Sequence, residues 1–143
     1  FSEVRVGVIG DVMLDTYMWG NVDRISPEAP VPVVSLQKKE YRIGGAGNVA
    51  LNLAALGCKV SIMSFMGDDE DGVVLKDLFQ KEGIDTKGLL VSKNRVTTNK
   101  MRVISRNQQM LRLDNEITTD LNDDDEKKII DAVKILNQYN VCE

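Results

Sequence analysis

The sequence predicts an α/β protein in which a parallel sheet bears a small β lid. Two observations lead to this prediction. Short runs of apolar, β-branched residues alternate with segments of helical character, which is the order of a parallel sheet with right-handed crossovers. Two β-rich segments, near residues 17–43 and 97–113, interrupt this alternation, and together they would form a small sheet that stands off the main body.

The parallel sheet is expected to contain strands over residues 4–9 (VRVGVI) and 59–66 (KVSIMSFM), each followed by Gly-Asp. A helix is expected over residues 48–56, and because it is apolar almost all round it is expected to be buried. A second helix, over residues 72–82, would end before a glycine, a residue type common at helix ends. Its predicted inward positions are Val73, Leu75, Leu78 and Phe79.

The lid segments and the end of the chain have weaker patterns. The first lid segment contains three prolines and two stretches, 31–36 and 39–43, that are typical of exposed strands. The second has the pattern of a hairpin that turns near residues 107–109. A last helix is expected over residues 122–139, and the acidic residues of its first turn are predicted to stabilise the helix N-terminus rather than to bind a metal. Another strand should begin at residues 141–143, so we expect the chain to be cut short.

Composition excludes several classes of function. The 143 residues suffice for one domain with a core, and 18 Lys and Arg against 22 Asp and Glu give a net charge of −4 with no basic block, so nucleic acid is not an expected partner. The sequence has neither an apolar run of the roughly 20 residues that a membrane span needs nor an N-terminal signal peptide, so we expect a cytoplasmic protein. Cys58 and Cys142 are far apart and histidine is absent, which predicts reduced, structural thiols and no metal site.

The run IGGAGNVALNLAALG at residues 43–57 admits three interpretations. The pattern G-x-G-x-x-A from Gly45 matches the dinucleotide-binding fingerprint, but the preceding residues, KKEYRI, are charged where that fingerprint needs a buried strand. In the second interpretation the glycines serve only close packing of a small-residue helix, which explains neither Gly44 and Gly45 before the helix nor Asn48 and Asn52 on one face. In the third, a polar ligand explains the glycines and the asparagines, because glycines admit it to the backbone and an asparagine both donates to and accepts from hydroxyl groups.

Several separated motifs resemble one family and occur in its order. The run GGAGNVA at residues 44–50, followed by Gly57 and Gly67, is similar to the N-terminal signature of the ribokinase-like (PfkB) sugar kinases. Within that family the chain most resembles the D-glycero-β-D-manno-heptose-7-phosphate kinases of lipopolysaccharide heptose synthesis, some of which carry a nucleotidyltransferase domain after the kinase domain. The resemblance implies a doubly wound α/β sheet with a β lid over the sugar, of which residues 1–143 are the N-terminal part. The other matching motifs are GDVMLD at 10–15, RISPEAPVPVV at 24–34 and QQMLRLD at 108–114.

The resemblance also implies sugar-binding roles for particular residues. Asp15 matches the aspartate that hydrogen-bonds sugar hydroxyls, and a carboxylate suits this role because it accepts from two adjacent OH groups at once. Gly44, Gly45 and Asn48 match the glycines and the asparagine that bind the sugar. Asp11 either forms the turn after the first strand or contacts the ligand, and the sequence leaves both open.

The second lid segment supplies cations. Strand alternation places Thr98, Lys100 and Arg102 on one face, so both cations can point into the site. A phosphorylated sugar needs cations at its non-reacting end, and the planar fork of arginine suits phosphate. The alternative is a solvated strand face with ordinary surface charge. Arg106 and Arg112 are weaker candidates for the same role.

For the complete enzyme, the resemblance implies in-line transfer of the γ-phosphoryl group of ATP to the anomeric hydroxyl of D-glycero-β-D-manno-heptose 7-phosphate, with Mg²⁺ bridging the phosphates. The later glycine-alanine-glycine-aspartate motif of the family, which supplies the general base, and its nucleotide-binding segment do not occur in this sequence. We therefore expect these residues to hold most of the sugar site, to hold neither ATP nor Mg²⁺ alone, and to be inactive alone.

Two alternatives stay open. One is a ribokinase-like kinase for another sugar or nucleoside, in which case the shared face of Lys100 and Arg102 has no obvious purpose. The other is a non-catalytic sugar-binding or dimerisation module. Val31, Val33 and Val34 on an exposed lid strand would be prone to edge pairing, so we expect a homodimer in which two lids cover each other.

Overall fold

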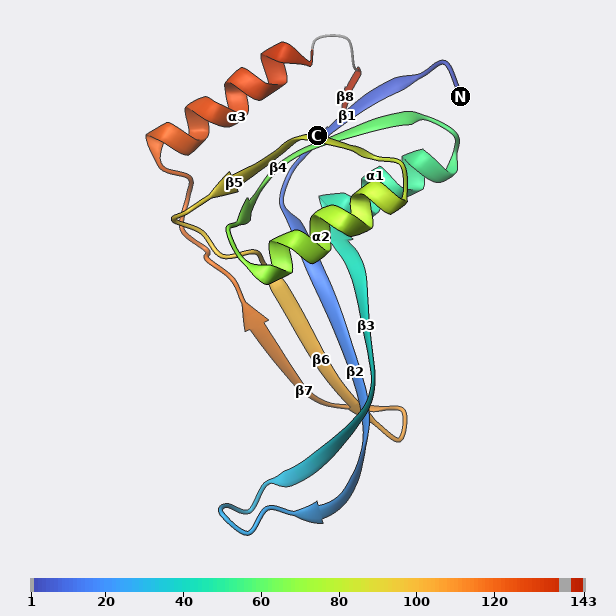
Figure 1. The fold of residues 1–143 in the computed structure, drawn as a ribbon, viewed down its shortest axis with the longest axis vertical. Coiled ribbons are helices and arrows are strands. Elements are labelled where there is room, and N and C mark those ends of the chain that lie inside the picture. The colour runs from blue at the N-terminus through green and yellow to red at the C-terminus, as the bar shows by residue number, and fades with distance from the viewer. Residues whose placement is uncertain (1, 137–139, 143) are drawn as a thin grey trace.

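The computed structural model describes residues 2–136 and 140–142. The body is a four-stranded sheet in the order β5-β4-β1-β8, in which neighbouring strands are parallel (Figure 1). The chain runs from β1 through β4 to β5 and then crosses back to β8 on the other side of β1, so the direction of winding reverses at β1. The strands are β1 (Arg5–Ile9), β4 (Lys59–Gly67), β5 (Asp85–Ser92) and β8 (Asn140–Cys142).

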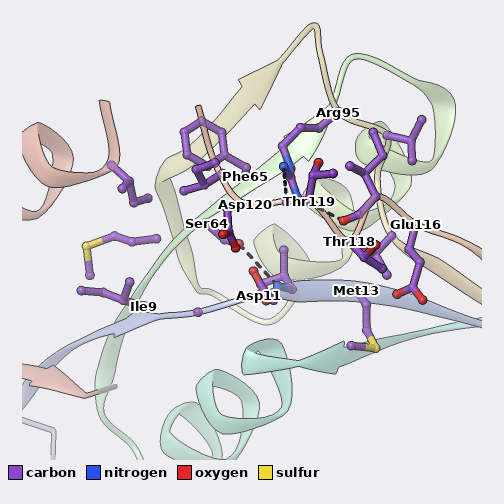
Figure 2. Close-up of a pocket in the computed structure, with 18 residues that line it drawn as sticks. Ile9, Asp11, Met13, Ser64, Phe65, Arg95, Glu116, Thr118, Thr119 and Asp120 are labelled. Carbon is purple, nitrogen blue, oxygen red and sulfur yellow. Dashed lines mark hydrogen bonds between the residues drawn. The ribbon is translucent and has the colours of Figure 1, made fainter. Parts of the chain in front are cut away.

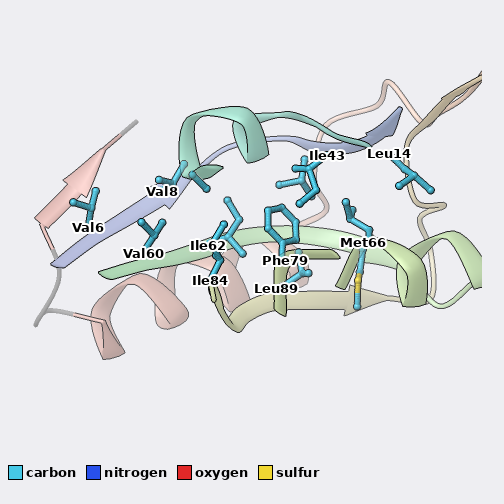
Figure 3. Packing of buried hydrophobic residues seen from close by; sticks show 13 residues of the cluster. Val6, Val8, Leu14, Ile43, Val60, Ile62, Met66, Phe79, Ile84 and Leu89 are labelled. Carbon is cyan, nitrogen blue, oxygen red and sulfur yellow. The ribbon is translucent and has the colours of Figure 1, made fainter. Parts of the chain in front are cut away.

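Helices cover both faces of this sheet, as a doubly wound fold requires. α1 (Ala46–Ala55) and α2 (Glu70–Lys81) lie on one face, and α3 (Asp123–Ile135) lies on the other (Figures 1 and 3). Asn122 caps α3, because its side-chain oxygen accepts from the Asp125 backbone N–H at 2.8 Å. The buried carboxylate of Asp125 in turn accepts from the Ser92 hydroxyl at 3.0 Å, so the acidic first turn of α3 also ties this helix to β5.

The core lies between the sheet and the layer of α1 and α2. Val8 and Ile62 are register partners on β1 and β4, and they belong to one cluster with Leu75 and Phe79 of α2; all four are at most 2% exposed (Figure 3). Burial of each such large side chain contributes roughly 1.5–3 kcal/mol. The same cluster includes Leu14, at the base of the lid, so the lid is anchored in the core of the body.

The lid is a second sheet, in the order β3-β2-β6-β7, that projects from the body (Figure 1). β2 pairs antiparallel with β3 and parallel with β6, and β6 pairs antiparallel with β7. Arg106 and Asn107 connect β6 to β7 with φ of 51° and 60°, as expected for a two-residue hairpin turn. The strands are β2 (Val12–Ile25), β3 (Pro32–Gly45), β6 (Asn99–Ser105) and β7 (Gln108–Asn115).

The lid strands differ from the sequence prediction in their extent. The stretches 31–36 and 39–43 were expected to be separate strands, but they form the single strand β3. Its partner β2 was not predicted, because polar residues and a glycine hide its pattern. The 14 residues of β2 run from the core to the far end of the lid, so one strand belongs to both parts of the molecule.

Three features of the body differ from the sequence prediction. β5 was not predicted, because the sequence DTKGLLVS has few apolar residues and lies at one edge of the sheet. The helix expected over residues 48–56 is not buried all round, since Val49 of α1 is 43% exposed and Leu56, which follows α1, is 60% exposed. Val73 was expected to point inward but is 70% exposed, because it shares a face of α2 with charged residues rather than with Leu75.

The end of the chain agrees with the sequence in part. The expected strand at residues 141–143 is present as β8, whereas α3 ends at Ile135. Residues 137–139 of the predicted helix and the side chain of Cys142 lie outside the described residues. Cys58 is a free, half-buried thiol. In the part of the chain that the structure describes, no helix is both long and apolar enough to cross a membrane.

Candidate functional site

A cavity of about 530 Å³ opens at the carboxyl ends of β1 and β4, below the base of the lid (Figure 2). It lies beside the point where the winding direction reverses, which is where open α/β sheets bind their ligands. The residues that line it include Asp11, which follows β1, and Ser64, which lies in the second half of β4. Met13, at the base of β2, also lines it, so the cavity reaches the face of the lid that Met13 occupies.

The wall of the cavity opposite β1 is the segment of residues 116–121 between β7 and α3. Arg95 holds this segment in place, because its guanidinium donates to the carbonyl oxygens of Ile117 and Thr119, both at 3.1 Å (Figure 2). Arg95, Ser64 and this segment were not predicted from the sequence. The one signal that could have identified Ser64 is its position near the end of a predicted strand.

Asp15 lies on the lid face that Met13 also occupies, two residues further along β2. Its carboxylate is only partly exposed, and its Oδ1 accepts a hydrogen bond from Nη1 of Arg102 at 2.8 Å. This hydrogen bond is the main reason that the pKa of Arg102 is raised above its usual value, although partial burial opposes the shift. The other oxygen, Oδ2, lies against Gly44 of β3, where any side chain would overlap it. A larger residue at position 44 would therefore displace the Asp15 carboxylate.

The rest of the glycine run connects β3 to α1 beside the cavity. Gly45 has φ of 62°, a left-handed conformation that favours glycine, and a side chain there would overlap the carbonyl oxygen of Asp11. That carbonyl accepts from the Ala46 N–H, at the start of α1, at 2.8 Å. Asn48 lies exposed in the first turn of α1. The structure thus brings Asp11, the glycines and Asp15 together where β1, β2 and β3 meet.

Strand register places the lid cations next to Asp15. We call the lid face that carries Met13, Asp15, Tyr17 and Trp19 of β2 the Asp15 face. Lys100 is the register partner of Asp15, and Arg102 is that of Tyr17, so both cations lie on this face. Arg112 is opposite Arg102 on the same face, whereas Arg106 is exposed in the β6–β7 turn.

The opposite face of the lid packs on α2 through a buried hydrogen-bond chain. Asn99 is 3% exposed; it donates to Asp71 at 2.9 Å and accepts from the Thr16 hydroxyl at 2.8 Å. Asp69 accepts from the backbone N–H and the hydroxyl of Thr97, at 2.8 and 2.6 Å. These bonds fix the start of β6 to the N-terminus of α2, and so they set the angle at which the lid leaves the body.

Asp69 is a carboxylate whose pKa the fold lowers. Burial raises its pKa, but hydrogen bonds from Thr97 and from the Gly72 N–H outweigh that effect and lower the pKa below its usual value. Its role is structural, because its hydrogen bonds join the N-terminus of α2 to Thr97, just before β6.

A reversing α/β sheet, a β lid and a glycine run at the start of α1 thus occur in one fold. Of the site residues predicted from the sequence, Asp11 is among those that line the cavity, whereas Asp15, the glycines, Asn48 and the lid cations are not. The family model for the pfkB family carbohydrate kinases matches residues 5–142. The chain belongs to this family. Among solved structures, this pfkB-family chain is similar to a putative sugar kinase from Clostridium perfringens, with a TM-score of 0.72 at 19% identity over 98% of this chain and 42% of that one. A ribokinase from Cryptococcus neoformans, in complex with ADP, gives a TM-score of 0.59 at 22% identity over 83% and 38% of the two chains.

Curated relatives of this pfkB-family chain carry the name "Bifunctional protein HldE". The protein from Geobacter sulfurreducens is 52% identical over 124 residues, which cover 87% of this chain and 25% of the relative. The protein from Desulfatibacillum aliphaticivorans is 47% identical over 143 residues, which cover 100% of this chain and 29% of the relative. The chain therefore spans little more than a quarter of the length of these relatives. The predicted fold and family are confirmed, whereas the sugar-binding roles of individual residues stay predictions.

Proposed function

We propose that this chain is the sugar-binding and lid part of an ATP-dependent kinase that phosphorylates D-glycero-β-D-manno-heptose 7-phosphate at its anomeric hydroxyl. The product would serve ADP-heptose and lipopolysaccharide core synthesis in the cytoplasm. The observation that supports this most is the placement of Asp15, held by Arg102 beside the cavity in a pfkB-family fold. The similarity to proteins named HldE supports the choice of the heptose, because the motifs that resemble heptose kinases lie in the matched region.

The proposed role of Asp15 follows from its surroundings. Arg102 occupies one carboxylate oxygen, which leaves the oxygen over Gly44 to accept from a sugar hydroxyl. Gly44 and Gly45 would let the sugar approach the backbone, and Asp11 and Asn48 would provide further hydrogen bonds beside them. Lys100, next to Asp15 in register, would attract the phosphate at the other end of the substrate.

ATP and Mg²⁺ are the cofactors we propose for the complete enzyme, where ATP supplies the phosphoryl group. Within the described residues, no three side chains of the metal-binding types come together. We therefore assign no step to a metal ion held by this chain. The part of the reaction that we assign to its residues is to bind, orient and cover the sugar.

We also infer that the lid pairs with a second copy of this chain. The face opposite Asp15 packs on α2 near the body, and further out it exposes apolar side chains, since Leu36, Leu111 and Leu113 are 57%, 52% and 45% exposed. A second lid would continue the same packing and cover the exposed strand edges. Light scattering of the full-length protein should give a dimer that Leu111→Glu converts to a folded monomer. A wild-type monomer would contradict this pairing.

The function is tested by ADP release from the full-length protein that carries this chain. The substrates compared are D-glycero-β-D-manno-heptose 7-phosphate, ribose, fructose 6-phosphate and fructose 1-phosphate, each with wild type and Asp15→Asn. Turnover should occur only with the heptose phosphate and should fall at least about a hundredfold in the variant, as expected when a charge-assisted contact to the reacting sugar is lost. Preference for another sugar would overturn the heptose assignment, and no turnover with any substrate would favour a non-catalytic module.

A further inference from the structure

Aromatic and cationic side chains gather on the Asp15 face of the lid, beyond Asp15 itself. Tyr17 and Trp19 are stacked, with ring centroids 5.7 Å apart and an angle of 18° between their planes. The guanidinium carbon of Arg42, on β3, is 4.3 Å from the centroid of the Tyr17 ring, and that of Arg102, on β6, is 5.3 Å from it. Two arginines from strands on either side of β2 therefore meet at one tyrosine.

Both arginines keep hydrogen-bond donors for a ligand. Arg42 uses Nε to bond Oε1 of Glu40 at 2.9 Å, so in the part of the chain that the structure describes neither terminal nitrogen is bonded to a carboxylate. Arg102 uses Nη1 for Asp15 and for the Lys100 carbonyl, which leaves its Nη2. A guanidinium has five N–H donors in a fixed fork that matches phosphate oxygens, so each of the two arginines can still donate to an anion.

The Asp15 face carries more positive than negative charge, which favours the binding of an anion. In the strand register of the lid, Arg102 lies directly opposite Arg112, and each is paired with one carboxylate, Asp15 at 2.8 Å and Asp114 at 3.0 Å. Among the described residues of this face, five cations accompany three carboxylates, although the whole chain has a net charge of −4. The cations are Lys38, Arg42, Lys100, Arg102 and Arg112, and the carboxylates are Asp15, Glu40 and Asp114.

The position of this cluster relative to Asp15 fits one substrate molecule. Arg42 is the register partner of Asp15 on β3, and neighbouring strands lie about 4.8 Å apart. Arg102 contacts both Asp15 and Tyr17. A sugar whose hydroxyl groups bind Asp15 would therefore have its far end over Tyr17, between the two arginines. A binding role for Arg42 was not predicted from the sequence, because the segment KKEYRI indicates only a charged, exposed strand.

We infer that Arg42 and Arg102, gathered at the ring of Tyr17, form the subsite for the phosphoryl group that a sugar substrate already carries. This inference rests on the proposed function and refines it, since it assigns the selection of phosphorylated over neutral sugars mainly to Arg42. Arg102 has a double role, because it also positions Asp15. Lys38 lies over Trp19, with Nζ 5.0 Å from the ring centroid, and is outside the subsite.

The test compares matched pairs of sugars with and without phosphate. Calorimetry would give the affinities of the full-length protein for D-glycero-D-manno-heptose and its 7-phosphate, and for fructose and its 6-phosphate. Arg42→Gln should weaken binding of the preferred phosphosugar by about tenfold or more, the effect of losing a charge-assisted contact, and should change that of the neutral sugar less than about twofold. Arg42→Lys should fall between, because lysine keeps the charge but loses the fork.

Lys38→Gln is the matched control, because it removes one exposed positive charge from the same strand and the same face. It should leave both affinities nearly unchanged. Equal losses from Arg42→Gln and Lys38→Gln would mean that only general charge attraction is at work, and they would overturn the subsite. So would an equal effect of Arg42→Gln on phosphorylated and neutral sugars, or a wild type without preference for phosphate. An Arg42-dependent preference for fructose 6-phosphate would keep the subsite and overturn the heptose assignment.

Discussion

The two faces of the lid sheet have opposite characters although the same strands form them. On the face toward α2, Leu14 and Thr16 are fully buried and the contacts are apolar packing and closed hydrogen bonds. On the Asp15 face, side chains are partly exposed and charged, and several keep unused donors. Alternation along β2 thus separates the residues that stabilise the fold from those that we propose to bind the ligand. Substitutions at neighbouring positions are therefore expected to have quite different effects.

The largest effect on stability is expected from Leu14→Ala, on the face toward α2. Leu14 is 0% exposed and belongs to the core cluster of the body, so its truncation removes buried area and leaves a cavity. The free energy of unfolding should fall by about 2–5 kcal/mol, measured by urea denaturation. Arg42→Gln, on the Asp15 face, should change it by less than about 0.5 kcal/mol. Similar losses for the two variants would refute the division of roles between the faces.

A smaller loss is expected when the hydrogen-bond chain under the lid is interrupted. Thr16→Val keeps the shape of the side chain but leaves the buried Oδ1 of Asn99 without its partner. This should cost about 1–3 kcal/mol in the same denaturation experiment. Thr86→Val is the control, because the hydroxyl of Thr86 accepts only an exposed bond from Gln80 at 3.4 Å. If Thr16→Val lowered the free energy of unfolding no more than Thr86→Val does, the hydrogen-bond chain would not hold the lid to α2.

The smallest effect concerns acid stability and the anchor of β6. Because the pKa of Asp69 is lowered in the folded protein, its contribution to stability is present above the pKa of an unfolded aspartate, about 3.9, and is lost as pH falls through the folded value. Wild type should therefore lose more stability than Asp69→Asn between about pH 4 and the acid limit of the fold. Leu14→Ala, which removes no charge, should shift the stability curve without changing this dependence. Parallel curves for wild type and Asp69→Asn would show that the hydrogen bonds of Asp69 do not favour its charged form.

How much of this arrangement the sequence predicted depends on how local each feature is. The strands β1 and β4 and the glycine run have strong local patterns, and the shared face of Lys100 and Arg102 follows from alternation alone. The contact between Arg102 and Asp15 joins residues 87 positions apart, and it depends on the parallel register of β2 and β6. Local patterns do not set such a register, so the pairing of Asp15 with Arg102 and the meeting of Arg42 with Tyr17 became visible only in the fold.

The same reason explains the missed elements. β2 and β5 contain polar residues and glycines. They become strands because neighbouring strands complete their hydrogen bonds: β3 and β6 on the two sides of β2, and β4 on one side of β5. Arg95 lies in a loop, and its role depends on the carbonyl groups of a segment more than 20 positions away. Tertiary context thus determines these features more than intrinsic propensity does.

The central claim is that the Asp15 face of the lid binds the sugar phosphate, and a crystal structure of the full-length protein with D-glycero-β-D-manno-heptose 7-phosphate tests it most directly. We expect a sugar hydroxyl within about 3 Å of the Asp15 carboxylate and phosphate oxygens within about 3 Å of the guanidinium groups of Arg42 and Arg102. A sugar phosphate bound on the opposite face of the lid, or bound away from Asp15, would contradict it.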